Sequence, residues 1–404
     1  MRKSKYTKYN EFILANSDKG IRTITNLIID RYNLSSESFS GLRKHVRKIK
    51  NLDDNSALEE YCENQGLPMD KVSGYWHKGK YNGVSMSVRV DNSEEDQSIT
   101  NEDIENCVKS VLKDYKKITV DKSRKDNQSA LKVVISDAHV GLDPNPDNES
   151  LFGYEYNQDI FHDNMRKVFN HILKEYQDNG TFQVLILEDL GDMVDGYNKQ
   201  TLRGGHHLPQ NMSNKEVFDT CVKARYNLIR NLIECGVANK YIIRSVTNDN
   251  HSGDFSWMIH RTVQHMLDLS VDANIKHDIL DRFMEHFVWG DHCFIVTHGK
   301  DKTHMKHGLP LVLNDKTVNF IQSYIDHHEI NSKYIHVEKG DLHQLGYQRH
   351  TKFDYRNYMS FAPGSSWQQH NFGSSYSGFA MQVIPKFSNE IKHTDIFFDL
   401  KKKK

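Results

Sequence analysis

Five short apolar runs in this chain are each followed by side chains of the kinds that bind metal ions. The segments that follow them are Asp137-Ala-His139, Gly191-Asp192-Met-Val-Asp195, Asn250-His251, His298-Gly299 and Gly340-Asp341-Leu-His343. Carboxylate, amide and imidazole groups in combination suit hard or borderline divalent cations. We therefore expect a fold that brings five distant segments of the chain to one place.

The apolar runs have the length and composition of strands, and they alternate with helical patterns. Strands are predicted over residues 131–135, 182–187, 241–246, 293–297, 334–337, 379–384 and 396–398, and helices over 160–176 and 216–235. This alternation predicts an α/β fold. In such folds the loops that follow the strands gather functional side chains, and each candidate ligand lies in such a loop.

The order of the five segments resembles the motif order of the calcineurin-like metallophosphoesterase superfamily, which is D-x-H, G-D-x-x-D, G-N-H-D/E, H and G-H-x-H. The resemblance covers about residues 130 to 400. One such segment alone is weak support, because carboxylates and histidines usually occupy solvated or satisfied polar positions. Five in the family's order are far more specific. The resemblance implies two facing mixed β-sheets wrapped by helices, a four-layer α/β/β/α sandwich.

The resemblance also implies two divalent metal ions and their ligands. The residues at the family's ligand positions are Asp137, His139 and His343 for the first ion, Asn250 and His298 for the second, and Asp192 for both. Manganese is the expected metal, with magnesium, iron and zinc as alternatives. A carboxylate shared by both ions keeps them close enough to activate one hydroxide, which attacks phosphorus. His251 would protonate the leaving oxygen, because imidazole titrates near neutral pH.

Two positions depart from the family's pattern. The motif G-N-H-D/E reads Asp249-Asn250-His251-Ser252 here, so the carboxylate that orients the histidine is absent from its place, although Asp254 lies two residues further on. Asp341 stands where the family has the first histidine of G-H-x-H, a ligand of the second metal. Aspartate also coordinates metals, and the alternative is that Asp341 points away and one metal is bound. We expect Asp195 to be a hydrogen-bond partner rather than a ligand.

The carboxylate of Asp341 makes the site less positive than the family's. Together with Asp137, Asp192 and a hydroxide it leaves a net charge of about zero on two divalent ions, where the usual set leaves about +1. A less positive site binds a dianion less well. We therefore expect a preference for phosphodiesters over phosphomonoesters, and for manganese or magnesium over softer ions at the second metal position.

The first 50 residues are basic, with twelve Lys or Arg against four Asp or Glu, although the whole chain has a net charge of −1. Apolar residues recur at helical spacing over 21–32 and again over 42–49, with Asn33-Leu34-Ser35-Ser36 between them. The polar face of the second pattern carries the basic side chains Arg43, Lys44, Arg47 and Lys48. This arrangement resembles a helix-turn-helix, and we expect residues 1–65 to contact DNA through these side chains. The alternative is a small helical bundle whose basic residues only keep it soluble.

Residues 66–129 connect this part to the phosphoesterase-like part, which is predicted over residues 130–400. Alternating side chains over 84–90 predict a small hairpin or strand. Thr100-Asn-Glu-Asp103 resembles a capping box that opens an amphipathic helix, and residues 121–128 have the composition of a polar linker. We place the domain boundary near residue 129.

The loops after the second and fourth segments are predicted to border the metals. They carry Arg203 and Lys300, which we expect to bind the substrate's phosphate. The alternative is that both are ordinary polar loop residues. Near the end of the domain, Gly364-Ser-Ser-Trp367 and residues 373–378 hold aromatic side chains among glycines and serines. Turns are the expected role of that region, with stacking on a base as the alternative.

The five cysteines, at 62, 107, 221, 235 and 293, show no paired spacing. This indicates neither a disulfide framework nor a zinc knuckle and favours a reducing cytoplasm. No stretch is long and apolar enough to span a bilayer, so no membrane partner is expected. The oligomeric state does not follow from the sequence.

Three functions compete on these grounds. The leading one is a phosphodiesterase or nuclease that acts on DNA at a two-metal site. The second is a metallophosphatase that acts on small nucleotides or phosphoproteins, with the basic segment serving protein contacts. The third is a non-enzymatic DNA-binding protein with a degenerate phosphoesterase fold, which the full ligand set disfavours.

Overall fold

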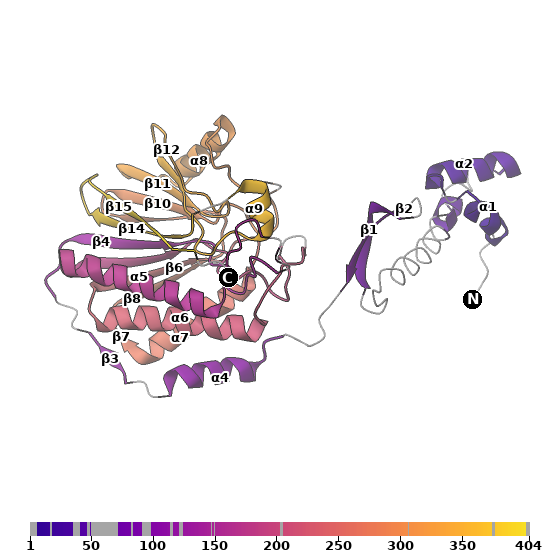
Figure 1. Ribbon diagram of the computed structural model, residues 1–404. Coiled ribbons are helices and arrows are strands. Elements are labelled where there is room, and N and C mark those ends of the chain that lie inside the picture. The colour runs from indigo at the N-terminus through magenta and orange to yellow at the C-terminus, as the bar shows by residue number, and fades with distance from the viewer. Residues whose placement is uncertain are drawn as a thin grey trace. The chain divides into compact units, whose positions relative to one another are not determined.

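The computed structural model describes residues 6–16, 18–34, 41–46, 49, 72–81, 84–90, 98–113, 116–120, 124–146, 148, 150–202, 205–305, 307–373 and 376–400. The chain divides into two compact units, Met1–Asp96 and Gln97–Lys404 (Figure 1). Among the described residues, no helix is long and apolar enough to cross a membrane. The cysteines described, at 107, 221, 235 and 293, are free thiols.

The first unit contains short helices and a hairpin. A 3-10 turn, Thr7–Tyr9, leads into α1 (Asn10–Leu14), which is followed by α2 (Ile21–Tyr32); residues 41–46 are also helical. Both predicted helical faces are confirmed, because they supply most of one buried cluster, formed by Tyr9, Ile13, Ile24, Ile28, Leu42, Val46 and Ile49. The hairpin predicted after them is also confirmed, as β1 (Val72–Tyr81) pairs antiparallel with β2 (Val84–Val90). Of the predicted turn, Asn33 and Leu34 are described, with Asn33 as the left-handed C-cap of α2, whereas Ser35 and Ser36 lie outside the described residues.

The second unit contains two mixed β-sheets. The larger has the order β15-β14-β4-β5-β6-β8, and its strands are β4 (Ser129–Ile135), β5 (Phe182–Asp189), β6 (Ala238–Val246), β8 (Ile275–Leu280), β14 (Gly378–Pro385) and β15 (Lys392–Phe397). The smaller has the order β12-β13-β11-β10-β9, and its strands are β9 (Glu285–Trp289), β10 (His292–Thr297), β11 (Tyr334–Lys339), β12 (Gly346–Arg349) and β13 (Asp354–Asn357). A separate parallel pair joins β3 (Ile118–Thr119) to β7 (Val271–Asp272). The mixed α/β character predicted from the sequence is confirmed.

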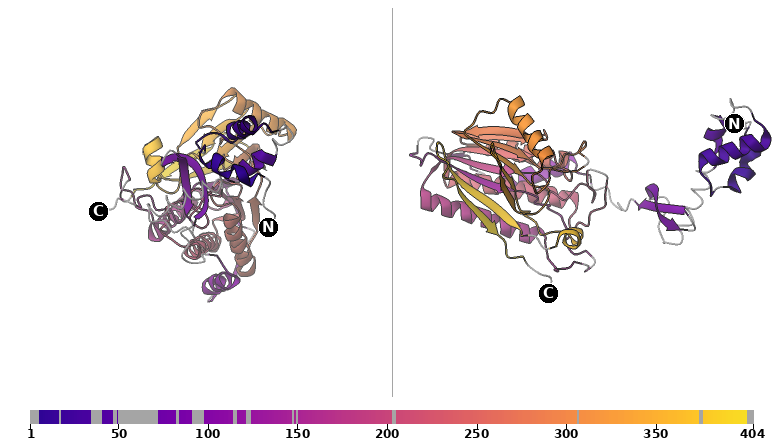
Figure 2. Two further views of the ribbon diagram at one scale, coloured as in Figure 1. Left: turned by 90° about the vertical axis from the view of Figure 1, so that its right-hand side faces the viewer. Right: turned by 90° about the horizontal axis from the view of Figure 1, so that it is seen from above.

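The side-chain alternation of the strands decides how these sheets pack. In β4, Ala130 and Val134 belong to a cluster that also holds Phe294 and Val296 of β10, so the two sheets face each other there. Leu131, Val133 and Ile135 of β4 face the opposite way, against helices α5 (Gln158–Asn179), α6 (Asn214–Glu234) and α7 (Asp254–Ser270). The outer face of the smaller sheet is covered by α8 (Asp315–His327). The views in Figures 1 and 2 show these helices on the outer sides of the two sheets.

The second unit begins before the boundary expected near residue 129. Helix α4 (Asn101–Leu112) opens with the predicted capping box, in which Thr100 accepts from the backbone of Asp103 and Asp103 accepts from the backbone of Thr100. Its apolar face packs against α6 and α7, and Cys107 is 2% exposed there. The division between the units therefore falls at Asp96 and Gln97, because the amphipathic helix we assigned to a connection buries its apolar face in the larger unit.

Candidate metal centre

The five ligand segments follow strands whose carboxyl ends point the same way within each sheet. In the larger sheet β4, β5 and β6 are parallel, and in the smaller sheet β10 is parallel to β11. The predicted ligands follow these strands directly, with Asp137 and His139 after β4, Asp192 after β5, Asn250 after β6, His298 after β10, and Asp341 and His343 after β11. All are buried except Asp341, whose side chain is 11% exposed.

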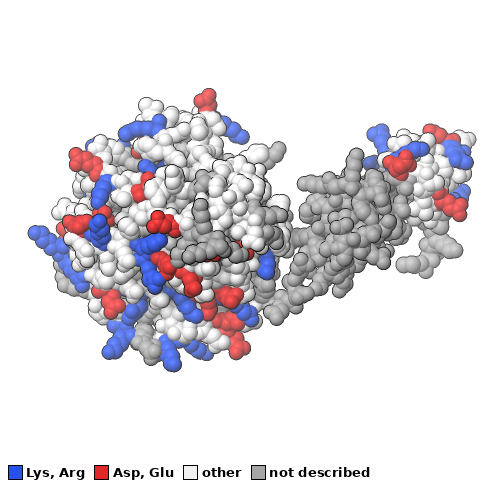
Figure 3. All heavy atoms as spheres, viewed as in Figure 1, with Lys and Arg blue, Asp and Glu red and all other residues white. Residues whose placement is uncertain are grey.

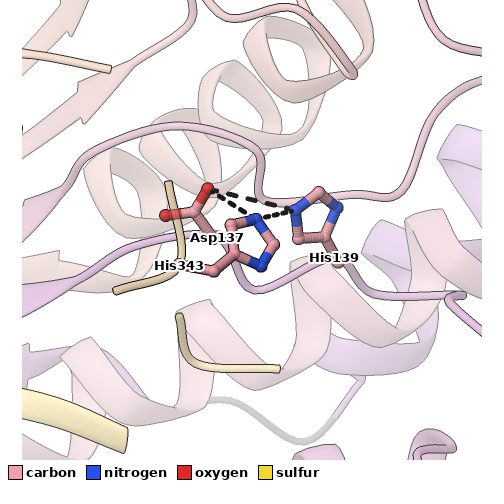
Figure 4. A group of neighbouring side chains, drawn as sticks. All are labelled: Asp137, His139 and His343. Carbon is pink, nitrogen blue, oxygen red and sulfur yellow. Dashed lines mark hydrogen bonds and ion pairs between the residues drawn. The ribbon is translucent and has the colours of Figure 1, made fainter. Parts of the chain in front are cut away.

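Asp137, His139 and His343 form the first group of donors, drawn in Figure 4. The Nε2 atoms of His139 and His343 lie 3.1 Å apart, and His343 Nε2 lies 3.2 Å from Asp137 Oδ1. Despite this proximity, the buried Oδ1 of Asp137 accepts no hydrogen bond from the described residues. Buried carboxylate oxygens are almost always satisfied, so these three atoms fit ligands that face a common cation better than they fit each other.

His298 is at the centre of the second group. Its Nε2 lies 3.1 Å from Asp192 Oδ2, 3.2 Å from Asn250 Oδ1 and 4.0 Å from Asp341 Oδ1. The same Oδ2 of Asp192 lies 3.8 Å from Nε2 of His139 in the first group. Asp192 is therefore placed between the two groups, where one carboxylate can serve both.

Neighbouring acceptors indicate which ring nitrogen of His298 and of His139 faces the centre. Nδ1 of His298 is 2.9 Å from the carbonyl oxygen of Leu190, which leaves Nε2 for a metal. Nδ1 of His139 is 2.9 Å from Asp195 Oδ1. Asp195 also clusters with His139 and His251 at a spacing that suits a metal. We assign it to orientation, because Nε2 of His139 already faces the first group and metal-binding histidines commonly hold a carboxylate at the other nitrogen.

The backbone at the ligands is strained. Five of them have φ in the left-handed region, namely Asp137 at 54°, His139 at 40°, Asp192 at 49°, Asp341 at 71° and His343 at 55°. Such conformations cost energy in residues other than glycine and cluster at functional sites. Gly340 is required for a different reason, because a Cβ there would meet Ser136 Oγ at 2.0 Å and Asp137 Oδ2 at 2.7 Å.

The pKa shifts of Asp137, Asp192 and His298 are those expected of a site that attracts a cation. Burial raises the pKa of Asp137, but His343 and His298 outweigh it and hold the pKa at about 2. Burial likewise opposes ionisation of Asp192, yet His298 and His251 bring its pKa well below the ordinary value. Burial lowers the pKa of His298, and Asp192 outweighs it and raises that pKa well above the ordinary value. The carboxylates are thus ionised, and positive charge is favoured among them.

His251 faces the cleft beside the second group, with 18% of its side chain exposed. Its Nδ1 lies 3.3 Å from the carbonyl oxygen of Asp195, and its Nε2 lies 3.9 Å from Asp192 Oδ2. Asp254, which follows two residues after Ser252, does not orient this ring, because its side chain is 97% exposed and lies 3.9 Å from Lys302 Nζ. The backbone carbonyl of Asp195 takes that place. Burial lowers the pKa of His251, but Asp192 and Asp195 outweigh it and raise the pKa.

Asp249 is a structural residue of the site whose role sequence reasoning missed. Its buried carboxylate accepts hydrogen bonds from the backbone N–H groups of Asp192, His251, Ser252 and Gly253, at 2.7 to 3.2 Å. Burial and the charge of Asp192 raise the pKa of Asp249 to about 6. An aspartate followed by Asn-His-Ser-Gly is a pattern typical of side-chain capping of a turn, and that signal was readable in the sequence.

A cleft of about 920 Å³ opens over the centre and is lined by Asp192, Asn250, His251, Asp341 and His343 among others. Lys300 also lines this cleft, as expected of a substrate-binding residue, whereas Arg203 lies outside the described residues. Gln368 was not anticipated. Its Nε2 lies 2.9 Å from Nδ1 and 3.2 Å from Nε2 of His343, so it contacts the ring of that predicted ligand.

The residues expected to contact DNA belong to the first unit. Arg43 and Lys44 are exposed on the helical segment 41–46, while Arg47 and Lys48 lie outside the described residues. Leu42 and Val46, on the same helical segment, are buried. The described part of the predicted basic face is therefore turned to solvent.

No protein-family model matches the sequence, and no curated protein matches it. Similar solved structures include Vps29 of Entamoeba histolytica in complex with Zn²⁺, with 11% identity over 67% of this chain and 99% of that one and a TM-score of 0.29. An archaeal phosphodiesterase has 10% identity over 66% and 99% of the two chains and a TM-score of 0.31. A predicted phosphoesterase of Streptococcus pneumoniae TIGR4 has 11% identity over 66% and 98% and a TM-score of 0.24. At these TM-scores the superpositions establish neither a shared fold nor a shared activity.

Proposed function

We propose that this chain is a metal-dependent phosphoesterase that cleaves phosphodiesters, with DNA as its substrate. The observation that carries the proposal is the position of Asp192, whose Oδ2 lies 3.8 Å from a nitrogen of the first donor group and 3.1 Å from a nitrogen of the second. The succession of helices, sheet, sheet and helix supports the four-layer metallophosphoesterase arrangement that the sequence resemblance implies.

In this proposal the residues of the site have different roles. Asp137, His139 and His343 would hold one divalent ion, Asn250, His298 and Asp341 the other, and Asp192 both. Two such ions supply Lewis acidity toward the phosphate and lower the pKa of water. His251, at the cleft wall with a raised pKa, carries the proton that the leaving oxygen needs, and Asp195 keeps its ring in place. Lys300 lines the same cleft, where its charge would attract the phosphate.

Asp192→Asn tests this assignment, with Asp254→Asn as the matched control on an exposed carboxylate. We expect the parent and the control to bind manganese and to hydrolyse bis-para-nitrophenyl phosphate, and Asp192→Asn to lose most of both. Bound metal is measured by elemental analysis after dialysis, and turnover by nitrophenolate release. Equal metal content and turnover in Asp192→Asn would remove the basis of the proposal.

The choice of DNA as substrate rests on the basic segment, because the first 50 residues contain twelve basic and four acidic residues. Arg43→Glu, Lys44→Glu and Arg47→Glu together should abolish retention of DNA in a gel shift at low salt, because non-specific affinity depends on the number of phosphate contacts. Turnover of the small diester should stay the same. Unchanged retention would instead support a helical bundle whose charges only maintain solubility.

A metallophosphatase for small nucleotides is the second candidate. On the face of the second unit drawn in Figure 3, the described basic and acidic side chains are interspersed, rather than forming a continuous basic band such as a long polyanion would follow. Hydrolysis of nucleotides without cleavage of DNA would favour this candidate.

A further inference from the structure

The cleft over the candidate metal centre is lined by Phe397 and by three more exposed aromatic side chains, Trp367, Phe372 and Tyr376, which we call the aromatic wall. They are 65%, 59% and 70% exposed. Trp367 and Phe372 meet edge to face at 5.5 Å between ring centroids. Aromatic rings that remain this exposed beside a polar site are typical of ligand-binding surfaces rather than of a core.

The aromatic wall is attached to the metal centre through helix α9 (Ser366–Phe372). Nε2 of Gln368 lies 2.9 Å from Nδ1 and 3.2 Å from Nε2 of His343, while its Oε1 accepts from the backbone N–H of Ser365 at 2.7 Å. The next residue, Gln369, is 1% exposed and accepts from Ser150 Oγ at 2.7 Å. These contacts hold Trp367 at a fixed place relative to a predicted metal ligand.

Away from the candidate metal centre, the lining of the cleft is partly apolar and carries little basic charge. Leucines and a proline, at 309, 310, 311, 342 and 345, line it together with the aromatic wall. Among its described lining residues, Lys300 is the one lysine or arginine. A duplex is gripped by cations along its phosphates, whereas an unpaired base offers a π face for stacking and needs few charges.

We propose that the aromatic wall stacks an unpaired nucleobase next to the phosphate at the metal centre, so that the site takes single-stranded DNA in preference to intact duplex. This rests on the proposed phosphodiesterase function. Stacking on an aromatic side chain contributes about 1–3 kcal/mol per base, which corresponds to about a 5- to 150-fold change in affinity. The base is thereby recognised by its ring face, without selection of its identity.

The test compares a ligand with a base, thymidine 5′-monophosphate, and one without a base, 2-deoxyribose 5-phosphate, on the full chain loaded with manganese. Both are too small to report on DNA contacts of the first unit. By isothermal titration calorimetry, we expect the nucleotide to bind about 5- to 150-fold more tightly than the sugar phosphate. In Trp367→Ala that ratio should fall toward one, and in Trp367→Phe most of it should return. Trp257→Ala is the matched control, since Trp257 is 46% exposed and does not line the cleft.

Turnover of methyl para-nitrophenyl phosphate, a diester without a base, is measured on the same proteins. It should be alike in the parent and in Trp257→Ala. Absence of this turnover in the parent contradicts the proposed function itself, whatever the result of the calorimetry. If the parent binds the nucleotide and the sugar phosphate with equal affinity, or if Trp367→Ala keeps the parent's affinity ratio, the stacking role of the aromatic wall is wrong. The proposed function would not be affected by that result. On oligonucleotides, kcat/KM should be higher for a single strand than for the same strand in a duplex, and the reverse order would also overturn it.

Discussion

Asp341 is the residue at which the candidate centre departs most from the resembled family. Its Oδ1 lies 4.0 Å from Nε2 of His298, so its charge is felt within the second donor group. Lys339, two residues earlier, is buried and bears the opposite charge. Burial lowers the pKa of Lys339 and the charge of Asp341 raises it, and the resulting pKa is about 8. The effect of the Asp341 carboxylate must therefore be isolated by substitution.

Asp341→His should raise the ratio of monoester to diester turnover, because removing one negative charge beside the phosphate favours the dianion. The expected change in the ratio of kcat/KM values is on the order of tenfold. Para-nitrophenyl phosphate and its bis-ester are compared with manganese present. Asp341→Asn, which removes the charge without supplying an imidazole, should change the ratio in the same direction. A ratio that stays constant in both variants would contradict the charge argument.

Asp249 organises the segment that carries Asn250 and His251. Asp249→Ala leaves several buried backbone N–H groups without their acceptor, so the free energy of unfolding should fall by about 2–4 kcal/mol. Chemical denaturation without metal measures this. Asp249→Asn keeps one acceptor oxygen and should lose less, whereas Asp254→Ala, at an exposed position, should lose almost nothing. Equal stability of all three variants would contradict the role assigned to Asp249.

At the scale of elements, a buried ion-pair network joins the facing sheets. Lys132 of β4 is fully buried and contacts Glu338 of β11, with Glu188 of β5 at 3.7 Å. Tyr358 donates to Glu338 at 2.7 Å, and Arg244 Nε lies 3.2 Å from Glu188. Burial raises the pKa of Glu338, but Lys132 outweighs it and the pKa ends below its ordinary value of 4.5.

Lys132→Met should lower the free energy of unfolding by about 3–5 kcal/mol, because it leaves buried carboxylates without their ammonium partner. Lys132→Met with Glu338→Gln should recover part of the loss. Since the folded pKa of Glu338 is depressed, its contribution is present above the carboxyl's unfolded pKa and is lost as the pH falls through the lower folded value. Denaturation at about pH 7 and about pH 3 should show this loss in the parent and not in the double variant. A single variant as stable as the parent would contradict the prediction.

The sequence was sufficient for those elements whose own pattern decides their structure. Apolar runs predicted β4, β5, β6, β10, β11 and β14, and helical spacing predicted α5 and α6. β12 and β13 are short and polar. Pairing rather than composition makes them strands, because β13 pairs with β11 and β12 pairs with β13. The ligand order was likewise visible in the sequence. The contact of Gln368 with His343 was not, because it joins a residue of α9 to a loop residue far from it in the sequence.

At the scale of the whole molecule, the position of α4 decides where the larger unit starts. The partly buried Ile104, Val108, Val111 and Leu112 pack against the core that includes α6 and α7. A chain of residues 97–404 should therefore fold and hydrolyse the small diester as the full chain does. A chain of residues 130–404, cut at the boundary expected from the polar linker, should be less stable by about 3 kcal/mol or more, because the apolar surface under α4 becomes exposed.

Thermal and chemical denaturation of the two shortened chains, monitored by circular dichroism, measures this difference. Cys107 offers a matched check within the full chain, since its thiol is 2% exposed and burial raises its pKa to about 12. It should resist a maleimide probe in residues 97–404 as it does in the full chain, whereas the exposed Cys235 should react in both. Rapid labelling of Cys107 in the folded full chain would mean that α4 is not docked. The division at Asp96 and Gln97 would then have no structural basis.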